Sequence, residues 1–370
     1  MTNKQYKVCH VTSAHDQLDD RIYLKECISL ANAGYKTYIV ARGESRRLNK
    51  VEIVGCGYPK NRRDRMTGFA KCIYLKAREL DCDVYHFHDP ELLPYAVKLK
   101  HAGKKVIFDS HEDVPAQIMD KEWLLGPIRF IISKMYKMYE SYAIGQFDAI
   151  VAATPHIAEK FAGRCSKVVT VNNYPKLDDI QFHEKSFTER EAIICYAGGI
   201  NELRGEKIMV EGMKNVDGTL ILAGDHEEQS FSNVKYVGRL GRSEVNTLYG
   251  SARAGLCILK PIKNYFYSHP IKMFEYMAAG LPVIASDFPL WKKIVEDNQC
   301  GICVNPIDVG AVKAACAELL GNPEKAQQMG RNGRAAVMEK YNWDNEEKTL
   351  LALYADLLQK ESPCRYGGSI

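Results

Sequence analysis

The sequence predicts an α/β protein made of two facing, doubly wound, Rossmann-like domains. Short apolar runs alternate with segments of helical periodicity, a pattern typical of parallel sheets covered by helices. A polar, irregular stretch at 173–192 interrupts this alternation, which then starts again. At 370 residues, the chain is also too long for one ordinary hydrophobic core.

In the first predicted domain, residues 1–172, six apolar runs indicate buried parallel strands. They are KVCHVTS (7–13), KTYIVA (36–41), VEIVG (51–55), DVYHFH (83–88), KVIFDS (105–110) and DAIVAA (148–153). Helical patterns between them predict helices at 21–34, 91–103 and 155–163. The first of these helices ends at a glycine, which is a common helix terminator.

The second predicted domain, residues 193–342, repeats the architecture without repeating the sequence. Its predicted strands are IICYAGG (193–199), GTLILAG (218–224), VKYVG (234–238), AGLCIL (254–259), PVIAS (282–286) and GICV (301–304). Its predicted helices are 205–214, 243–252, 270–279, 308–320 and 323–340. A last helix at 343–360 begins with Asp344 as its expected N-cap, and we expect no structure in the tail 361–370.

Composition excludes several classes of protein. Basic and acidic residues are nearly equal in number, and the formal net charge of +4 does not indicate nucleic-acid binding. The N-terminal sixteen residues contain no long apolar run, and no stretch approaches the roughly 18–20 apolar residues of a membrane span. The 12 cysteines are scattered, and Cys300 and Cys303 lack the partner pair of a metal site. We therefore expect a cytoplasmic protein with reduced thiols.

A glycine-containing loop follows the first strand of the second domain, in YAGGINELRG (196–205). Gly198 and Gly199 allow a ligand to approach the backbone, and Arg204 next to a helix start favours an anion. A simple tight turn is the alternative interpretation. The loop is not a G-x-G-x-x-G motif, so the usual form of dinucleotide binding is poorly supported.

A second candidate loop lies at the start of the predicted helix 270–279. Pro270 is expected at the first helical position with Ser268 as its cap, and the amides near Ile271 with the Lys272 ammonium suit a phosphate. Glu275 lies on the same helix face as Lys272, where ribose hydroxyls would be a good partner. The alternative is an ordinary Lys–Glu pair on a solvated face.

Polar residues also cluster after three strands of the first domain, at 13–22, 86–91 and 109–114. Parallel strands bring such ends to one edge of a sheet, so these clusters predict a second site, although any one histidine could be structural. The candidates there are His15, Asp20, Arg21, His88, Asp89 and His111. A zinc site is the competing interpretation, but H-E-x-x-H or a comparable spacing is absent.

These motifs together resemble the family 4 retaining glycosyltransferases. The resemblance covers nearly the whole chain and includes PIKMFEYMAAGLPVIASD (270–287), YAGGINELRG, LILAGD (220–225), VKYVGRL (234–240), CGICVNPID (300–308) and YNWDNEEKTLLALY (341–354). It implies the GT-B fold, with the last helix crossing back to the N-terminal domain. Many members carry a donor-sugar glutamate eight residues before Glu275, where this chain has Tyr267.

The resemblance also implies roles for the candidate residues. Glu275 matches the ribose-binding glutamate, Gly238 lies on the nucleobase side, and His111 matches a histidine beside the donor sugar. His15, Asp20, Arg21, His88 and Asp89 would form the acceptor side. Arg204 and Lys272 would stabilise the leaving diphosphate without a metal ion; the one D-x-D match, at 81–83, precedes a strand and is discounted.

The expected function is therefore retaining transfer from a nucleotide-diphosphate sugar, with UDP-sugar favoured, to a glycan or polyprenyl-linked glycan in surface polysaccharide biosynthesis. A sugar-nucleotide epimerase of the same fold and a non-catalytic carbohydrate- or nucleotide-binding protein are the alternatives. A basic, aromatic-flanked segment at 126–145, preceded by Trp123, Leu124 and Leu125, favours a helix packed on the core. Peripheral contact with the inner face of a membrane is its alternative interpretation.

Overall fold

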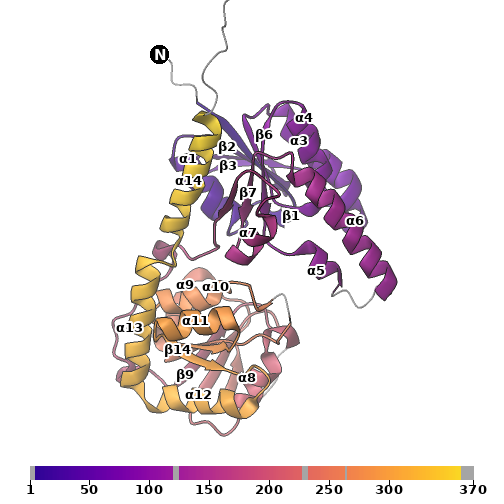
Figure 1. The fold of residues 1–370 in the computed structure, drawn as a ribbon. Coiled ribbons are helices and arrows are strands. Elements are labelled where there is room, and N and C mark those ends of the chain that lie inside the picture. The colour runs from indigo at the N-terminus through magenta and orange to yellow at the C-terminus, as the bar shows by residue number, and fades with distance from the viewer. Residues whose placement is uncertain (1–4, 120–124, 227–231, 263–264, 360–370) are drawn as a thin grey trace, which may run out of the picture. The chain divides into compact units, whose positions relative to one another are not determined.

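The structure is a computed structural model that describes residues 5–119, 125–226, 232–262 and 265–359. The chain divides into two compact units (Figure 1). Unit 1 comprises Met1–Asn172 and Glu346–Ile370, and unit 2 comprises Asn173–Asn345. Each unit has its own sheet and its own hydrophobic core, as the repeated strand–helix alternation predicts.

Unit 1 contains an eight-stranded sheet in the order β3-β4-β2-β1-β5-β6-β7-β8. Neighbouring strands are parallel, except that β3 is antiparallel to β4. The strand bounds are β1 (Lys7–Asp16), β2 (Lys36–Arg42), β3 (Arg46–Leu48), β4 (Val51–Gly55), β5 (Val84–Phe87), β6 (Lys105–Ser110), β7 (Ala149–Ala152) and β8 (Val168–Thr170). The strand order reverses between β1 and β5, and such switch points are where open α/β sheets bind ligands.

The helices of unit 1 connect these strands. They are η1 (Ile22–Cys27), α1 (Ile28–Asn32), α2 (Arg62–Asp64), η2 (Arg65–Phe69), α3 (Ala70–Glu79), η3 (Pro90–Leu92), α4 (Leu93–His101), α5 (Val114–Met119), α6 (Gly126–Ile144) and α7 (Pro155–Phe161). The predicted helix 21–34 begins as the π-helical segment η1. Sequence reasoning missed the helical stretch 62–79, where basic residues and Gly68 interrupt the apolar periodicity.

Unit 2 contains a six-stranded, fully parallel sheet in the order β11-β10-β9-β12-β13-β14. Its strands are β9 (Ile193–Ala197), β10 (Thr219–Ala223), β11 (Val234–Tyr236), β12 (Ala254–Cys257), β13 (Val283–Ser286) and β14 (Gly301–Val304). Its helices are η6 (Glu202–Arg204), α8 (Glu206–Met213), α9 (Arg242–Ser251), α10 (Ile271–Ala278), α11 (Pro289–Asp297), α12 (Val309–Gly321) and α13 (Pro323–Glu339). The switch point lies between β9 and β12, the strands that precede the two candidate loops.

The stretch 173–192, expected to be a linker, packs against unit 2. It contains two 3₁₀ turns, η4 (Leu177–Asp179) and η5 (Phe187–Glu189). Tyr174, Ile180 and Phe187 are buried in the core of unit 2. Since three of its side chains help to build that core, the stretch is structurally part of the unit.

The last helix, α14 (Trp343–Gln359), returns to unit 1 from Glu346 onwards, as the GT-B fold predicts. The Glu346 carboxylate accepts hydrogen bonds from the Asn172 backbone N–H (2.7 Å) and side-chain amide (3.0 Å). The cap is Asn342 rather than the expected Asp344, because the Asn342 Oδ1 accepts from the Asn345 N–H at 3.1 Å.

Helix α6 contradicts the expectation that segment 126–145 packs on the core. Only Glu140, Ala143 and Ile144 of this helix are buried, and most of its large apolar side chains are exposed. Trp123 and Leu124 lie outside the described residues. Across the described ranges, we find no helix with the length and hydropathy needed to span a membrane.

Candidate functional site

The glycine loop of unit 2 brings two cationic side chains against its backbone. Gly198 has φ +142°, a conformation that side-chain-bearing residues rarely adopt, and a Cβ there would lie 2.9 Å from the Lys272 Nζ. A Cβ on Gly199 would lie 3.3 Å from the Arg204 Nη1. The paired glycines therefore leave the space in which Lys272 and Arg204 approach the end of β9, as expected for an anion-binding loop.

Lys272 is the most unusual group in this loop. Its Nζ is buried and has no hydrogen-bond partner among the described residues, and it lies 3.5 Å from the ring centroid of Tyr196. Burial, helped by Arg204 and opposed by Cys257 and Glu275, lowers the pKa of Lys272 to about 8. A buried ammonium with no anion is costly, so this position is prepared for a negatively charged ligand.

Tyr196 links the ammonium to the loop. Its ring lies under Lys272, and its hydroxyl donates to the Gly199 carbonyl at 2.6 Å. Burial raises the pKa of Tyr196 to about 12, so the hydroxyl stays protonated and keeps donating at neutral pH. The phenol therefore fixes the position of the loop and offers its π-face to the cation.

The start of α10 differs in detail from the sequence prediction. Pro270 is the N-cap rather than the first helical residue, and the helix begins at Ile271 without a side-chain cap. The Ser268 hydroxyl does not cap it, since it donates to the Tyr265 carbonyl at 3.0 Å. The Met273 N–H donates to the Pro270 carbonyl at 3.1 Å, and the amides of Ile271 and Lys272, which precede it, are the first-turn donors that suit an anion.

Glu275 is held in place by two residues that sequence reasoning missed. The Arg242 guanidinium lies 2.8 Å from one carboxylate oxygen, and the Tyr249 hydroxyl donates to the other at 3.2 Å. Both partners lie on α9. Glu275 is therefore not the simple solvated partner of Lys272, and its carboxylate is oriented from a neighbouring helix.

Gly238 joins the same edge of the sheet. Its carbonyl accepts a hydrogen bond from the Gly224 N–H at 2.7 Å. Its φ is +69°, and a Cβ at this position would have open space around it. A Cβ on Gly224 would lie 2.1 Å from the Gly198 carbonyl oxygen. The loops after β9, β10 and β11 are thus in close contact. Tyr267, the departure from the family pattern, is 44% exposed.

In unit 1, Asp89 organises the loop after β1. Its Oδ2 accepts hydrogen bonds from the Ser13 N–H (2.6 Å), the Ala14 N–H (3.1 Å) and the Thr12 hydroxyl (2.7 Å). This carboxylate is buried and braces the β1 and β5 ends at the switch point. Its remaining oxygen lies 3.5 Å from the His15 Nε2.

His15, His88 and His111 come together at this edge of the sheet. The ring of His111 lies 5.7 Å from the ring of His15 and 5.7 Å from that of His88. Burial lowers the pKa of His111 to about 4, although Asp109 opposes the shift. Burial also opposes protonation of His15, but a 3.1 Å contact with Asp19 and the charge of Asp89 leave its pKa raised. A neutral and a more basic imidazole thus stand side by side.

The structure corrects the prediction for Arg21, while the acceptor role expected of Asp20 stays a prediction. Arg21 is 4% exposed and pairs with Asp109 (3.0 Å) and Glu26 (3.0 Å), so its guanidinium neutralises buried carboxylates and does not face a substrate. Asp20 is exposed, whereas the missed Asp19 contacts His15 and accepts from the amides of Arg21 and Ile22. Which of the two neighbouring acids faces His15 depends on the geometry of the turn, and the sequence does not reveal that geometry.

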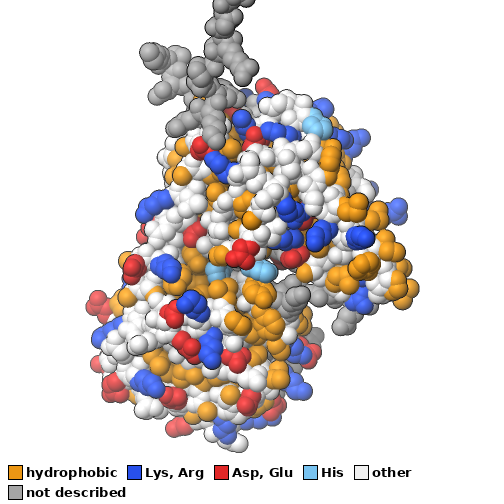
Figure 2. Space-filling view, in the orientation of Figure 1, with side chains coloured by type: hydrophobic (Ala, Val, Ile, Leu, Met, Phe, Trp, Pro, Cys, Tyr) orange, Lys and Arg blue, Asp and Glu red, His pale blue; other side chains and the backbone are white. Residues whose placement is uncertain are grey.

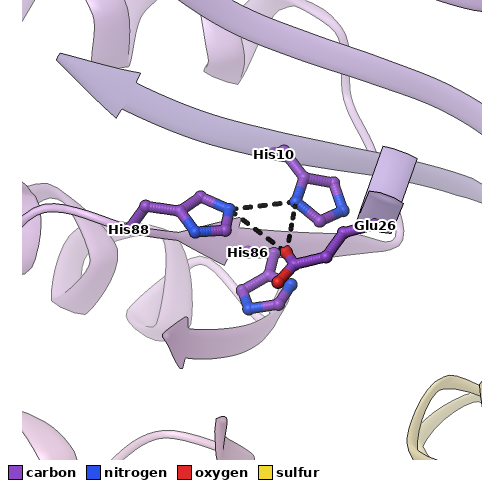
Figure 3. Close-up of side chains that lie close together, drawn as sticks. All are labelled: His10, Glu26, His86 and His88. Atoms are coloured by element: carbon purple, nitrogen blue, oxygen red, sulfur yellow. Dashed lines mark hydrogen bonds and ion pairs between the residues drawn. The ribbon is translucent and has the colours of Figure 1, made fainter. Parts of the chain in front are cut away.

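Behind this edge lies a buried cluster of His10, Glu26, His86 and His88 (Figure 3). The His10 Nδ1 lies 3.0 Å from the His88 Nε2 and 3.5 Å from a Glu26 oxygen. This group, and a second one of His88, Asp109 and His111, have ligand atoms close enough together to hold a metal ion.

The charges around these groups already include a cation. Arg21 already contacts both Glu26 and Asp109. Burial and the nearby Asp109 raise the pKa of Glu26 well above its usual value, despite Arg21, and burial lowers the pKa of His10. The guanidinium would repel a divalent cation placed beside these carboxylates.

Two family matches divide the chain in the same way as the fold. The family described as Glycosyl transferases group 1 matches residues 178–336, within unit 2. Glycosyltransferase Family 4 matches residues 23–173, almost all of them in unit 1. Together the two matches account for most of the chain.

Individual relatives are more distant. An MMP alpha-(1->4)-mannosyltransferase of Mycolicibacterium hassiacum is 27% identical over 138 residues, which cover 35% of this chain and 34% of that protein. The match thus spans about a third of that relative's length. The D-rhamnosyltransferase WbpZ of Pseudomonas aeruginosa is 21% identical over 324 residues, covering 81% of each chain.

Solved structures share the architecture. A sucrose-phosphate synthase from Thermosynechococcus elongatus superimposes with a TM-score of 0.76 over 97% of this chain and 100% of that chain, at 18% identity. This likeness establishes the fold, and each of the two family matches covers one of its units. The chain therefore belongs to the group 1, family 4 glycosyltransferases and has the GT-B fold.

Proposed function

We propose that this protein transfers a sugar from a nucleotide-diphosphate sugar to a glycan or polyprenyl-linked glycan, with retention at the anomeric carbon and without a metal ion. The observation that carries the proposal is the buried, unpaired ammonium of Lys272 beside the glycine loop. A diphosphate would supply the missing anion. We expect UDP as the nucleotide and surface polysaccharide biosynthesis as the setting.

The proposed donor site uses the loops at the switch point of unit 2. The diphosphate would lie against the Gly198 and Gly199 backbone, the Lys272 ammonium, the Arg204 guanidinium and the first-turn amides of α10. Glu275, oriented by Arg242 and Tyr249, would accept hydrogen bonds from the ribose hydroxyls. Gly238 leaves room beside this edge for the nucleobase.

In the proposed reaction, the bond between the anomeric carbon and the diphosphate oxygen breaks while the acceptor oxygen bonds to the same face of that carbon. The acceptor's proton passes to the leaving phosphate. Negative charge builds on the diphosphate, where Lys272 and Arg204 stabilise it, an effect that is often worth several kcal/mol. The two cations would thus do what a divalent ion does in other transferases.

The acceptor side is proposed to involve His111, His15 and Asp89 of unit 1, with His88 supporting His111. Because its pKa is lowered to about 4, His111 is neutral at physiological pH and can accept or donate a hydrogen bond to a sugar hydroxyl. His15, with its raised pKa, is the better candidate to contact an anionic acceptor group. We propose a cytoplasmic location for these reactions.

Nucleotide release from a panel of UDP-, GDP- and ADP-sugars tests the proposal, since many transferases hydrolyse their donor slowly without an acceptor. We expect release of one nucleoside diphosphate, UDP first, that falls at least about 100-fold in Arg204→Ala and in Glu275→Ala. Met338→Ala, on α13, is a matched control that should retain wild-type release, since Met338 is exposed and outside the proposed site.

Two outcomes would replace the proposal. Isomerisation of the nucleotide sugar without nucleotide release would indicate the epimerase alternative. Binding of a nucleoside diphosphate without turnover, even with a membrane lipid extract as the acceptor source, would indicate a non-catalytic binding protein. Product linkage, read from the anomeric proton coupling of the glycoside, tests retention separately.

A further inference from the structure

Helix α6 presents a continuous apolar face to solvent. Seven exposed side chains on this helix recur at intervals of one and three residues, so they form one stripe. They are Ile128, Ile131, Ile132, Met135, Met138, Tyr139 and Tyr142. Met135 and Met138 at its centre are each 66% exposed, and Leu125 before the helix is 72% exposed. We call these eight residues the α6 face.

Three polar side chains of the helix contact the rest of unit 1 instead. The Ser133 hydroxyl donates to the Pro115 carbonyl at 2.9 Å, and the Arg129 guanidinium donates to the Met119 carbonyl at 2.9 Å. Glu140 is buried and pairs with Arg164 at 3.1 Å. These contacts fix the rotation of the helix about its axis, so the outward orientation of the apolar stripe is built into the fold.

The charge next to the α6 face is positive. Lys134 and Lys137 are exposed. Lys134 borders the apolar stripe, three residues after Ile131 and four before Met138, and Lys137 lies one turn further along, next to Lys134. The single acidic residue of α6, Glu140, is buried and neutralised by Arg164. Figure 2 shows hydrophobic side chains gathered over α6 with Lys and Arg side chains among them. Exposed α6 therefore combines apolar and cationic groups, with no exposed carboxylate of its own.

We propose that the α6 face docks this protein on the surface of an anionic phospholipid bilayer. An amphipathic helix lying in the bilayer interface buries apolar side chains between the headgroups, while adjacent lysines bind the anionic headgroups. The helix is too polar to span the bilayer. A second copy of the chain fits less well, because α6 packed on α6 would bring the lysines of both copies together without a carboxylate between them.

This inference deepens the proposed function, on which its biological role rests, because a docked enzyme would meet polyprenyl-linked acceptors at the membrane surface. The binding itself requires no turnover. Vesicle binding and donor hydrolysis are therefore independent measurements, and the failure of one does not imply the failure of the other.

Sedimentation of the full-length protein with lipid vesicles tests the docking. Wild type should bind vesicles of phosphatidylcholine with phosphatidylglycerol, and Met135→Glu/Met138→Glu should bind at least about tenfold less. The matched control is Met66→Glu/Met338→Glu, which places two charges at methionines of similar exposure on other elements and should bind like wild type. All three proteins should hydrolyse the donor in solution at the same rate, which also shows that they fold.

The lysines are tested separately. Lys134→Gln/Lys137→Gln should lower the partition coefficient for anionic vesicles about fivefold per lysine and should change binding to pure phosphatidylcholine little. The proposal is overturned if wild type ignores anionic vesicles, or if the Met135→Glu/Met138→Glu variant binds as well as its control. It is also overturned if wild type is a dimer in solution that these glutamates dissociate, because the α6 face would then be a subunit interface.

Discussion

At Lys272, the proposed binding of an anion conflicts with the stability of the unliganded fold. The Lys272 ammonium is buried, and its contacts are the ring of Tyr196 and the backbone near Gly198. The folded state therefore favours the neutral amine, whereas the unfolded chain leaves the ammonium in water. A bound diphosphate would reverse this preference, since it supplies the opposite charge.

We predict that Lys272→Met stabilises the unliganded protein by about 1–3 kcal/mol at neutral pH, because it removes an uncompensated buried charge of similar side-chain length. Urea unfolding measures this gain. It should shrink between about pH 8 and 10.5, as the folded and then the unfolded wild-type lysine loses its proton. Donor hydrolysis should fall at least about 100-fold. If Lys272→Met instead lowered the free energy of unfolding, the buried ammonium would not be a destabilising feature of the unliganded fold.

The same residue predicts a pH profile. Because the pKa of Lys272 is lowered to about 8, the ammonium is present below that pH and is lost as the pH rises through it. Since kcat/KM reports groups of the free enzyme, kcat/KM for the donor should be level towards pH 7 and fall about tenfold per pH unit well above 8. In Lys272→Arg, whatever activity remains should not show this fall. An unchanged profile in that variant would assign the titration to another group.

Residue types and local spacing were enough to single out Gly198, Lys272 and Glu275 in two candidate loops, and the family resemblance joined these loops into one expected donor site. Local spacing could not reveal Arg242 and Tyr249, because these lie about 30 residues before Glu275 and reach it only through the packing of α9 against the sheet. Arg21 was misplaced for the same reason. Its guanidinium was expected to face the acceptor, but it is buried against Asp109, which comes from another strand.

At the level of elements, α14 is bound to unit 1 by buried polar contacts. The Tyr354 hydroxyl lies 2.9 Å from the His86 Nδ1 and 3.3 Å from the His10 Nε2. Removing this hydroxyl would leave buried imidazole nitrogens without a partner. The helix thus contributes both apolar surface and a polar group to the core behind the histidine edge.

We predict that Tyr354→Phe destabilises the protein by about 1–3 kcal/mol, the usual range for a buried polar group left unpaired. Thermal unfolding measures the loss. Tyr58→Phe, at a tyrosine that is 67% exposed, should change stability little and serves as the matched control. The KM for donor hydrolysis should remain unchanged in both, because the proposed donor loops belong to unit 2. Equal stability of the two variants would contradict the anchoring role of the hydroxyl.

The same scale shows why periodicity predicted some elements and not others. Buried parallel strands give continuous apolar runs, so β1, β2, β5 and β6 were readily predicted. Helix α6 has an equally clear apolar stripe, but periodicity identifies a stripe without saying what it faces. Its outward orientation is set by hydrogen bonds from Ser133 and Arg129 to backbone carbonyls at Pro115 and Met119. Such contacts are tertiary and leave no local signal in the sequence.

At the scale of the whole molecule, each unit has its own neutralising charges, and this bears on the need for a metal. In unit 2, Lys272 and Arg204 supply positive charge at the proposed diphosphate site. In unit 1, Arg21 pairs with both Asp109 and Glu26, the acids of the two potential metal-binding groups. We propose that these cations take the place of a divalent ion in both units.

We therefore predict that donor turnover survives removal of metal. After dialysis against EDTA, nucleotide release should change less than about twofold, and elemental analysis should find far less than one metal ion per chain. The unfolding temperature should also be unaffected, because the His10, Glu26, His86 and His88 cluster would be held by shared protons rather than by an ion. Loss of activity restored by one equivalent of a divalent metal would contradict this. Retained activity with loss of stability would instead place a structural metal in the cluster and leave the donor chemistry as proposed.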